Sequence, residues 1–231
     1  CKTYTCVGTQ AVEDAKRSCG FVHLYVRKGL RCERLCGPQS GPAVCGRLFV
    51  GDRSVDLAVV HLMPGHSGTS ARVRQLTDIV KTLRSGTMLV VGDMNVRPAE
   101  LDELLNIGDF VDASYEGRSF YPAQSRYDMT TVSEGAVGVG YAFDRVLHTK
   151  DSQAAVFLVG KARILSEGVR FCLSDHYALL GYFDFHASYR EGPVKVARDR
   201  RGALTALRDQ ASVIEVQEVR ALSRDAWQHA S

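Results

Sequence analysis

Apolar residues follow two different spacings along the chain, and each spacing predicts a different kind of element. Runs rich in β-branched and aromatic residues, bounded by Gly, Pro or Asp, are typical of strands. Such runs occupy residues 21–27, 43–50, 54–60, 87–91, 142–148, 154–159 and 176–185. The turn Gly51-Asp52-Arg53 separates the second run from the third, which predicts a hairpin.

Helical spacing marks two segments, at 69–84 and 98–106. The first begins at Thr69 or Ser70, which are good N-cap residues. Its apolar positions are Val73, Leu76, Ile79, Val80 and Leu83. Periodicity is then lost from about 109 to 140, and so long an irregular stretch within a domain is typical of a functional segment.

The composition changes beyond His186 to a segment rich in Arg, Ala, Asp and Glu. Within it, residues 197–226 carry apolar positions at loosely helical spacing, which predicts one or two amphipathic helices outside the core. Acidic residues accompany the basic ones, so a solvated helix face is favoured over a surface for a phosphate backbone. We therefore divide the chain into a domain at 1–186 and a charged helical tail at 187–231.

The length and the amino-acid composition are those of one ordinary globular domain. Of 231 residues, 45% are hydrophobic and 24% are charged, which excludes a disordered chain and a coiled-coil rod. The formal net charge of +3 is too small to indicate a nucleic-acid partner by charge alone. No apolar run approaches the roughly 18 residues of a membrane span, so we predict no such span.

Cysteine usage and the start of the chain bear on its location. The seven cysteines are an odd number, and Cys1 is not followed by the charged and apolar regions of a signal peptide. Both features favour an intracellular protein with reduced thiols and argue against secretion. The spacing of Cys32, Cys36 and Cys45 matches no paired zinc motif. Because the first residue is not Met, we expect the chain to be an internal excerpt of a longer protein.

Polar side chains stand at the ends of several predicted core strands, where they project toward a cleft rather than into the core. They are His61, Asp93, Asn95, Asp144, Asp175 and His176. Carboxylates with an amide oxygen are hard ligands that suit Mg²⁺ or Mn²⁺, and these ions bind substrate phosphate. Each motif alone is equally compatible with a turn or a strand cap. Together they favour phosphoester chemistry, in which a positioned group orients water and others neutralise charge on the phosphate oxygens.

The order of the motifs is more informative than any one of them. His-Leu-x-Pro at 61–64, Gly-Asp-x-Asn at 92–95, a strand containing Asp144 and Ser-Asp-His at 174–176 follow one another. This order resembles that of the endonuclease/exonuclease/phosphatase superfamily over about residues 20–186. The resemblance implies an α/β fold: a four-layer sandwich of two mainly antiparallel sheets with outer helices, and a Mg²⁺-dependent phosphoesterase site at one end.

Within the superfamily, the sequence looks most like the tyrosyl-DNA phosphodiesterase 2 branch. The matching segments are Gly92-Asp93-Met94-Asn95-Val96-Arg97, Phe143-Asp144-Arg145-Val146 and Ser174-Asp175-His176-Tyr177-Ala178-Leu179-Leu180. Arg74-Gln75-Leu76, after His61, also agrees. Members of that branch release a tyrosine attached to a DNA 5′ phosphate by a trapped topoisomerase. The resemblance therefore implies DNA as the partner, DNA repair as the process and the nucleus as one candidate compartment.

The resemblance also implies a role for each site residue. The catalytic residues would be His61, Asp93, Asn95, Asp144 and His176. Among them Asp93 and Asn95 would orient water and bind phosphate, while Asp144 would orient His176. The Mg²⁺ or Mn²⁺ ligands would be Asp175 and Asp93, and the substrate contacts would be Arg97 and Tyr121.

Two departures from the branch pattern stand out. Its Thr-Trp-Asn and Leu-Gln-Glu motifs, which supply an Asn and the main metal-binding Glu, are absent, since Gln10 and Glu13 are not adjacent. The expected aromatic-Asp motif reads Ser119-Phe120-Tyr121-Pro122, without the Asp. We expect the domain at 1–186 to be truncated at its N-terminal side and the fragment to have weak activity at best.

Two alternatives stay open at this point. The same fold and site serve abasic-site and retroelement endonucleases, deadenylases, inositol phosphatases and sphingomyelinases, and the site motifs do not choose among them. A scaffold module whose hydrolase site has decayed would also lack the metal-binding Glu. An intact Gln-Glu step about 30 to 60 residues upstream of Gly20 would favour the enzyme over the scaffold.

Overall fold

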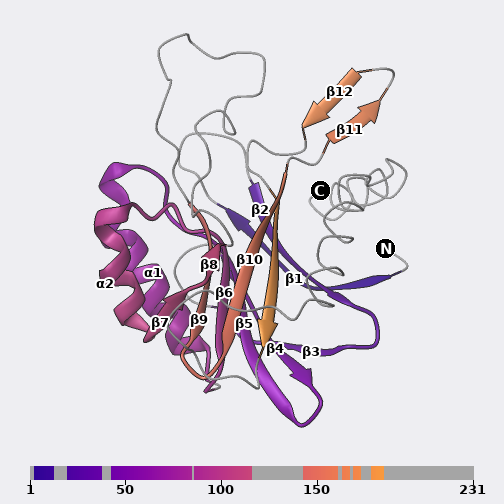
Figure 1. Ribbon diagram of the computed structural model, residues 1–231, viewed down its shortest axis with the longest axis horizontal. Helices are drawn as coiled ribbons and strands as arrows, with labels where there is room; N and C mark the ends of the chain where they lie inside the picture. The colour runs from indigo at the N-terminus through magenta and orange to yellow at the C-terminus, as the bar shows by residue number, and fades with distance from the viewer. Residues whose placement is uncertain are drawn as a thin grey trace.

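The computed structural model describes residues 3–12, 20–37, 43–84, 86–115, 143–160, 163–166, 169–172 and 178–184 (Figure 1). Its strands are β1 Tyr4–Val12, β2 Gly20–Arg27, β3 Arg31–Arg34, β4 Ala43–Val50, β5 Arg53–His61, β6 Met88–Asp93, β7 Phe110–Asp112, β8 Ser114–Tyr115, β9 Asp144–Thr149, β10 Gln153–Gly160, β11 Arg163–Ser166, β12 Val169–Cys172 and β13 Ala178–Asp184. Its helices are α1 Thr69–Thr82 and α2 Leu101–Ile107, each preceded by a 3₁₀ turn, at His66–Gly68 and Pro98–Glu100.

A six-stranded sheet in the order β3-β4-β5-β6-β9-β7 forms the centre of the fold. β5 and β6 pair in parallel, and the other neighbours in this sheet pair antiparallel. A parallel pair requires a crossover connection, and α1 provides it. The carboxyl ends of β5 and β6 therefore lie side by side at one edge of the sheet.

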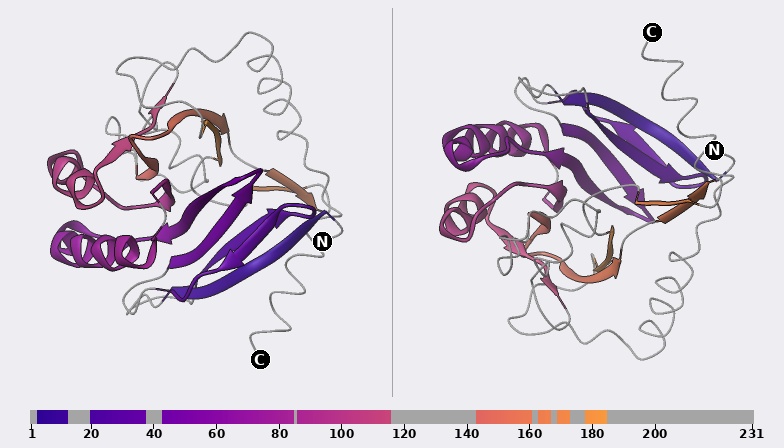
Figure 2. Two further views of the ribbon diagram at one scale, coloured as in Figure 1. Left: turned by 90° about the horizontal axis from the view of Figure 1, so that it is seen from below. Right: turned by 90° about the horizontal axis from the view of Figure 1, so that it is seen from above.

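The two helices cover one face of this sheet (Figure 2). Alternate side chains of a strand point to opposite faces, and one set, including Val60 of β5 and Val90 of β6, packs with Leu76 and Ile79 of α1. Leu104 of α2 completes this core and is fully buried. In the part of the chain that is described, neither helix has the length and the apolar character needed to cross a membrane.

A second β layer covers the opposite face (Figure 2). The hairpin β1–β2 packs through Val22 on Leu57 and Val59 of β5, and the sheet β13-β10-β8 packs through Ala154 on Val146 of β9. The α/β class and the mainly antiparallel pairing are thus confirmed. In the described ranges, the two helices lie on one face of the central sheet, and two separate small sheets, β1-β2 and β13-β10-β8, lie on the other. This arrangement is compatible with the expected four-layer sandwich, which stays a prediction.

Most predicted elements coincide with observed ones, but the start of α1 differs. Either Thr69 or Ser70 was expected as the N-cap, whereas the N-cap is Gly68, the last residue of the 3₁₀ turn that precedes α1. The Thr69 hydroxyl donates instead to Oε1 of Glu100 at 2.6 Å, so it is not available to cap the helix. The hydrogen bond from Thr69 to Glu100 thus takes the place of the capping hydrogen bond that was expected within the helix.

Six observed strands were not predicted: the nine-residue β1 and the short strands β3, β7, β8, β11 and β12. The exposed edge strand β3, Arg-Cys-Glu-Arg, has no apolar alternation to mark it. β1 contains Gly8, at which a Cβ would lie 2.8 Å from Val44 Cγ1, so this glycine allows the β layers to approach closely. The expectation of irregular chain from 109 is wrong at 110–115, where β7 and β8 form. Residues 116–142 and the predicted tail at 187–231 lie outside the described residues.

Cys6, Cys32, Cys36 and Cys45 were expected as free thiols, and they are free. Cys45 faces the helices, 1% exposed. Burial, together with the negative charge of Asp56, raises the pKa of its thiol to about 11. That thiol is therefore protonated and unreactive at neutral pH.

His148 on β9 makes stability sensitive to acid. It is 1% exposed, its Nδ1 lies 3.0 Å from the Thr149 carbonyl oxygen, and its ring meets Phe183 edge-on. Burial lowers its pKa below the ordinary 6.5, although Thr149 and Asp151 oppose the shift. Since the unfolded chain binds the proton more readily, we expect the free energy of unfolding to fall as pH drops below about 6.5, by at most about 1.4 kcal/mol per pH unit.

Urea unfolding between pH 5 and 7.5 measures this effect. The His148→Phe variant should lose most of the slope, whereas His61→Gln, at a side chain that is 40% exposed, should keep it. Equal slopes in the wild type and His148→Phe would show that another group is responsible.

Candidate active site

Three of the predicted site residues form one row across the central sheet. The parallel register pairs His61 of β5 with Asp93 of β6, and the antiparallel register pairs Asp93 with Asp144 of β9. Val59, Val91 and Val146 lie two positions away from these residues on the same strands, and they pack against the second β layer. By strand alternation, the row lies on the face between the two β layers, at the rim of the sheet.

Asp93 is held at both carboxylate oxygens. Its Oδ1 accepts a hydrogen bond from the backbone N–H of Asn95 at 2.9 Å, and its Oδ2 lies 3.6 Å from Nε2 of His61. The side chain is 17% exposed, so part of it remains accessible to solvent. The row therefore presents an oriented acid beside an imidazole, which can pair electrostatically when the imidazole is protonated.

Asn95 closes the turn that leaves β6. It adopts a left-handed backbone conformation, φ 52°, which Asn tolerates better than most residues. Its Nδ2 donates to the Leu62 carbonyl oxygen at 3.0 Å, and the residue is 8% exposed. One N–H of the amide thus connects the segment after β6 to the segment after β5, and the group has a second N–H to offer.

Gly92 has a structural reason to precede Asp93. Its φ is +132°, and a Cβ there would lie 2.1 Å from the carbonyl oxygen of Val60 on β5. Backbone bonds beyond it, Leu62 N–H to Asp93 O and Met94 N–H to Phe143 O, are both 2.8 Å long. The glycine therefore allows the three strands to stay paired up to the site.

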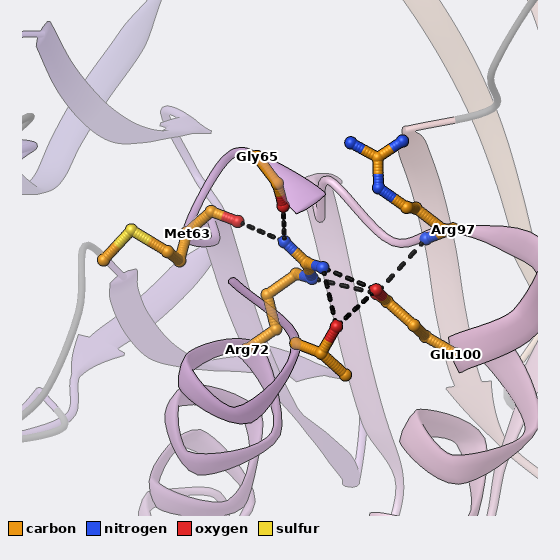
Figure 3. A network of polar contacts seen from close by, with 6 residues as sticks. Met63, Gly65, Arg72, Arg97 and Glu100 are labelled. Carbon is orange, nitrogen blue, oxygen red and sulfur yellow. Dashed lines mark hydrogen bonds and ion pairs between the residues drawn. The ribbon is translucent and has the colours of Figure 1, made fainter. Parts of the chain in front are cut away.

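Behind the row lies a buried polar network that joins two segments, which we call the β5 loop, residues 62–65, and the β6 loop, residues 94–97 (Figure 3). Arg72 of α1 is 0% exposed and donates to Oε1 and Oε2 of Glu100 at 2.6 and 3.0 Å. It also donates to the carbonyl oxygens of Met63 and Gly65 at 2.8 and 2.9 Å. Burial tends to raise the pKa of Glu100, but bonds from Arg72, Thr69 and the Arg97 N–H outweigh it, so that pKa lies below its ordinary value.

Sequence reasoning noted Gln75 but missed Arg72 and Glu100. Gln75 accepts a hydrogen bond from the Met63 N–H at 2.9 Å and is 7% exposed. The signal for Arg72 was present: it lies one turn before Leu76, on the apolar face of α1, where a charged residue needs a buried partner. No local signal marks Glu100, which ends the 3₁₀ turn before α2.

The two arginines of the matched motifs have different surroundings. The side chain of Arg97 points away from the network (Figure 3). Its guanidinium carbon lies 5.8 Å from the centre of the ring of Phe143, the residue before Asp144. Arg145 points away from the row and forms a buried ion pair with Asp112 of β7. Burial raises the pKa of Asp112, and the positive charge of Arg145 opposes that shift. Arg97 is thus the arginine near the site, and Arg145 joins strands.

The remaining predicted site residues, Tyr121, Asp175 and His176, lie outside the described residues. Within the described ranges, no group of three or more His, Cys, Asp or Glu side chains is arranged to hold a metal ion. Mg²⁺ usually takes only one or two protein carboxylates and completes its shell with water and phosphate oxygens. The hard oxygen donors of Asp93 and Asn95 fit that chemistry, without forming a closed protein cage.

Solved structures show the fold family. TDP2 from Caenorhabditis elegans, in truncated form, matches with a TM-score of 0.54 and 16% identity over 79% of this chain and 76% of that chain. TDP2 from D. rerio, complexed with a single-strand DNA product, gives 0.53 and 16% over 79% and 77%. This likeness shows that the chain shares the fold of these TDP2 structures, in agreement with the resemblance that the motif order indicated.

Two further comparisons are weaker. Beta toxin from Staphylococcus aureus with bound magnesium ions matches at a TM-score of 0.49 and 18% identity over 68% of this chain and 67% of that chain, too low to support an argument. Against another structure of that toxin, this chain spans 57% of the toxin's length. Neither a family model nor a curated protein matches the sequence.

Proposed function

We propose that this chain carries the site of a divalent-metal-dependent phosphodiesterase that hydrolyses a phosphoester bond in nucleic acid, with a 5′-tyrosyl DNA end as the first-choice substrate. One observation carries the proposal: His61, Asp93 and Asn95 meet at the end of a parallel strand pair on the fold shared with TDP2. The single-strand DNA product bound to the D. rerio protein supports nucleic acid as the substrate class.

The contacts support a separate catalytic role for each of these residues. Asp93 is oriented by the Asn95 N–H, so it can hold a water molecule in line with the leaving oxygen and take its proton. The second amide N–H of Asn95 and the imidazole of His61 can donate to nonbridging phosphate oxygens, where negative charge grows. Arg97 adds a cation suited to bidentate phosphate contact.

Asp144 of β9 and the residues Tyr121, Asp175 and His176, which lie outside the described ranges, complete the proposal. Asp144 would hold the imidazole of His176 in the correct tautomer for a phosphate contact, and Tyr121 would stack on a base or on the substrate tyrosine. Mg²⁺ or Mn²⁺, held by Asp93 and Asp175, would supply Lewis acidity at the phosphate. An intracellular location, with the nucleus as one candidate compartment, stays a prediction.

A substrate panel tests the proposal. The purified protein should cleave bis(p-nitrophenyl) phosphate slowly and a 5′-tyrosyl oligonucleotide faster, with cleavage stopped by EDTA and restored by Mg²⁺ or Mn²⁺. The matched substrates are an abasic-site duplex, poly(A) RNA, an inositol phosphate and sphingomyelin. Preference for one of these would assign another phosphoesterase activity. No cleavage of any substrate, also after extension of the chain at its N-terminal side, would favour the scaffold.

A further inference from the structure

The β5 loop, which is neither helix nor strand, is held almost entirely by side chains. The Leu62 carbonyl oxygen accepts from Asn95 Nδ2, the Met63 N–H donates to Gln75 Oε1, and the Met63 and Gly65 carbonyl oxygens accept from Nη1 of Arg72. Each of these bonds is between 2.8 and 3.0 Å. The path of the chain directly after His61 therefore depends on side chains from α1 and from the β6 loop.

The β6 loop is tied to the same guanidinium through Glu100. Its Oε2 accepts from the Arg97 N–H at 3.4 Å and from Nε of Arg72 at 3.0 Å, while Oε1 accepts from Nη2 of Arg72 and from the Thr69 hydroxyl, both at 2.6 Å. The planar guanidinium fork of Arg72 thus bonds to the β5 loop through Nη1 (Figure 3). Its Nε and Nη2 bond to Glu100, whose carboxylate accepts the N–H of Arg97 in the β6 loop.

We propose that Arg72 and Glu100 are positioning residues of the phosphodiesterase site, which fix the distance between the β5 and β6 loops so that His61 and the Asp93–Asn95 turn address one phosphate. This inference rests on the proposed function for its activity arm. Arg72 touches no reacting atom. A Lys at this position keeps the charge but cannot form the fork, because an ammonium lacks its planar arrangement of donors.

A purely structural role would predict something different. A buried ion pair adds little net stability compared with apolar packing, so stability alone is a weak reason for this network. The chain contains a matched pair elsewhere: Arg47 binds both carboxylate oxygens of Asp56 at 2.7 and 3.0 Å, and Asp56 is 0% exposed. That pair joins β4 to β5, and Asp56 also accepts a hydrogen bond from the backbone N–H of Arg84, just after α1. None of these bonds involves the β5 loop or the β6 loop.

The low pKa of Glu100 fits a constant positioning role. A carboxylate that stays ionised well below neutral pH keeps the fork engaged over the whole range in which the enzyme would work. Changes of rate between pH 6 and 9 would then come from groups that touch the substrate.

The activity arm compares Arg72→Lys and Glu100→Gln with the control Asp56→Asn, each assayed well below its own unfolding temperature. We expect kcat to fall about tenfold to a hundredfold in the first two, with KM changed less, since a misplacement near 1 Å has an effect of that size. The control should keep its kcat. Combining Arg72→Lys with Asn95→Ala should give much less than the product of the two effects, because both disturb the same loop contact.

The second arm does not need activity. Hydrogen exchange of the Leu62 and Met63 amides, which bond to Asp93 O and Gln75 Oε1, reports directly on the β5 loop. Exchange at both should accelerate by about tenfold or more in Arg72→Lys and stay unchanged in Asp56→Asn. Should Arg72→Lys fail to fold, Thr69→Val removes the hydroxyl that donates to Glu100 and accepts from Nη2 of Arg72, but leaves the Arg72–Glu100 pair in place. This variant should show a smaller acceleration at the same amides.

The outcomes separate the two proposals. Unchanged exchange at Leu62 and Met63, or a kcat loss equal to that of the control and additive with Asn95→Ala, overturns the positioning role. A wild type that cleaves no phosphodiester overturns the proposed function, and the exchange arm then decides alone whether Arg72 and Glu100 fix the loop.

Discussion

Replacing Asp93 by Asn should lower phosphodiester cleavage at least about a hundredfold while leaving the protein folded. Asn keeps the shape of the side chain and can still accept from the Asn95 N–H, but it cannot take a proton from water. The loss should appear in kcat, since the carboxylate acts on the attacking water. Initial rates on bis(p-nitrophenyl) phosphate at saturating Mg²⁺ give the comparison.

Asp52→Asn is the matched control for that experiment. Asp52 lies exposed in the turn between β4 and β5, at the opposite end of β5 from the site. The same chemical change there should leave the rate within a factor of two or so, as expected for a surface substitution. A rate for Asp93→Asn near that of the control would remove Asp93 from the mechanism.

Gly92→Ala should destabilise the fold by about 2–6 kcal/mol, from backbone strain and overpacking together. The added methyl group would meet the Val60 carbonyl oxygen, on a neighbouring strand that cannot move aside without breaking its own pairing. Asp93 follows directly, so activity should fall further than the folded fraction does. Urea unfolding followed by circular dichroism measures the stability, and the assay above measures the activity.

Gly86→Ala provides the comparison for this effect. Gly86 lies exposed shortly before β6, and a Cβ there would meet nothing within 4 Å. Its change in stability should stay within about 0.5 kcal/mol. A Gly92→Ala protein within about 1 kcal/mol of the wild type would mean that β5 and β6 can separate at the site without cost.

The sequence predicted the elements that carry an apolar pattern and missed those that do not. β5, β6 and α1 were found within a few residues, because each places a continuous apolar face on the core. β3 and β7 were missed, since an exposed or very short strand has no pattern to read. The nine-residue strand β1 was missed as well. Thr69 was assigned a local role as a cap, and only the fold shows that Glu100 takes its hydroxyl.

The site residues also fall into two groups, those that a sequence motif marks and those that only the fold brings together. Motif order predicted His61, Asp93, Asn95 and Asp144 as site residues, and the register places three of them in one row. Their catalytic roles stay predictions. The supporting residues Arg72 and Glu100 are separated along the chain and meet only through packing, so no motif could contain both. The contribution of Asp175, His176 and Tyr121 stays a prediction.

The register across β5, β6 and β9 also constrains the order in which the site can be assembled during synthesis. The pair β4–β5, α1 and β6 are close in sequence and can associate early, whereas β9 joins β6 only after a long intervening stretch has left the ribosome. Asp144 begins β9, so the row stays incomplete until that late pairing forms. A chain synthesised only through β6 can therefore bring Asp93 and His61 together, but it lacks Asp144 and so does not have the complete row.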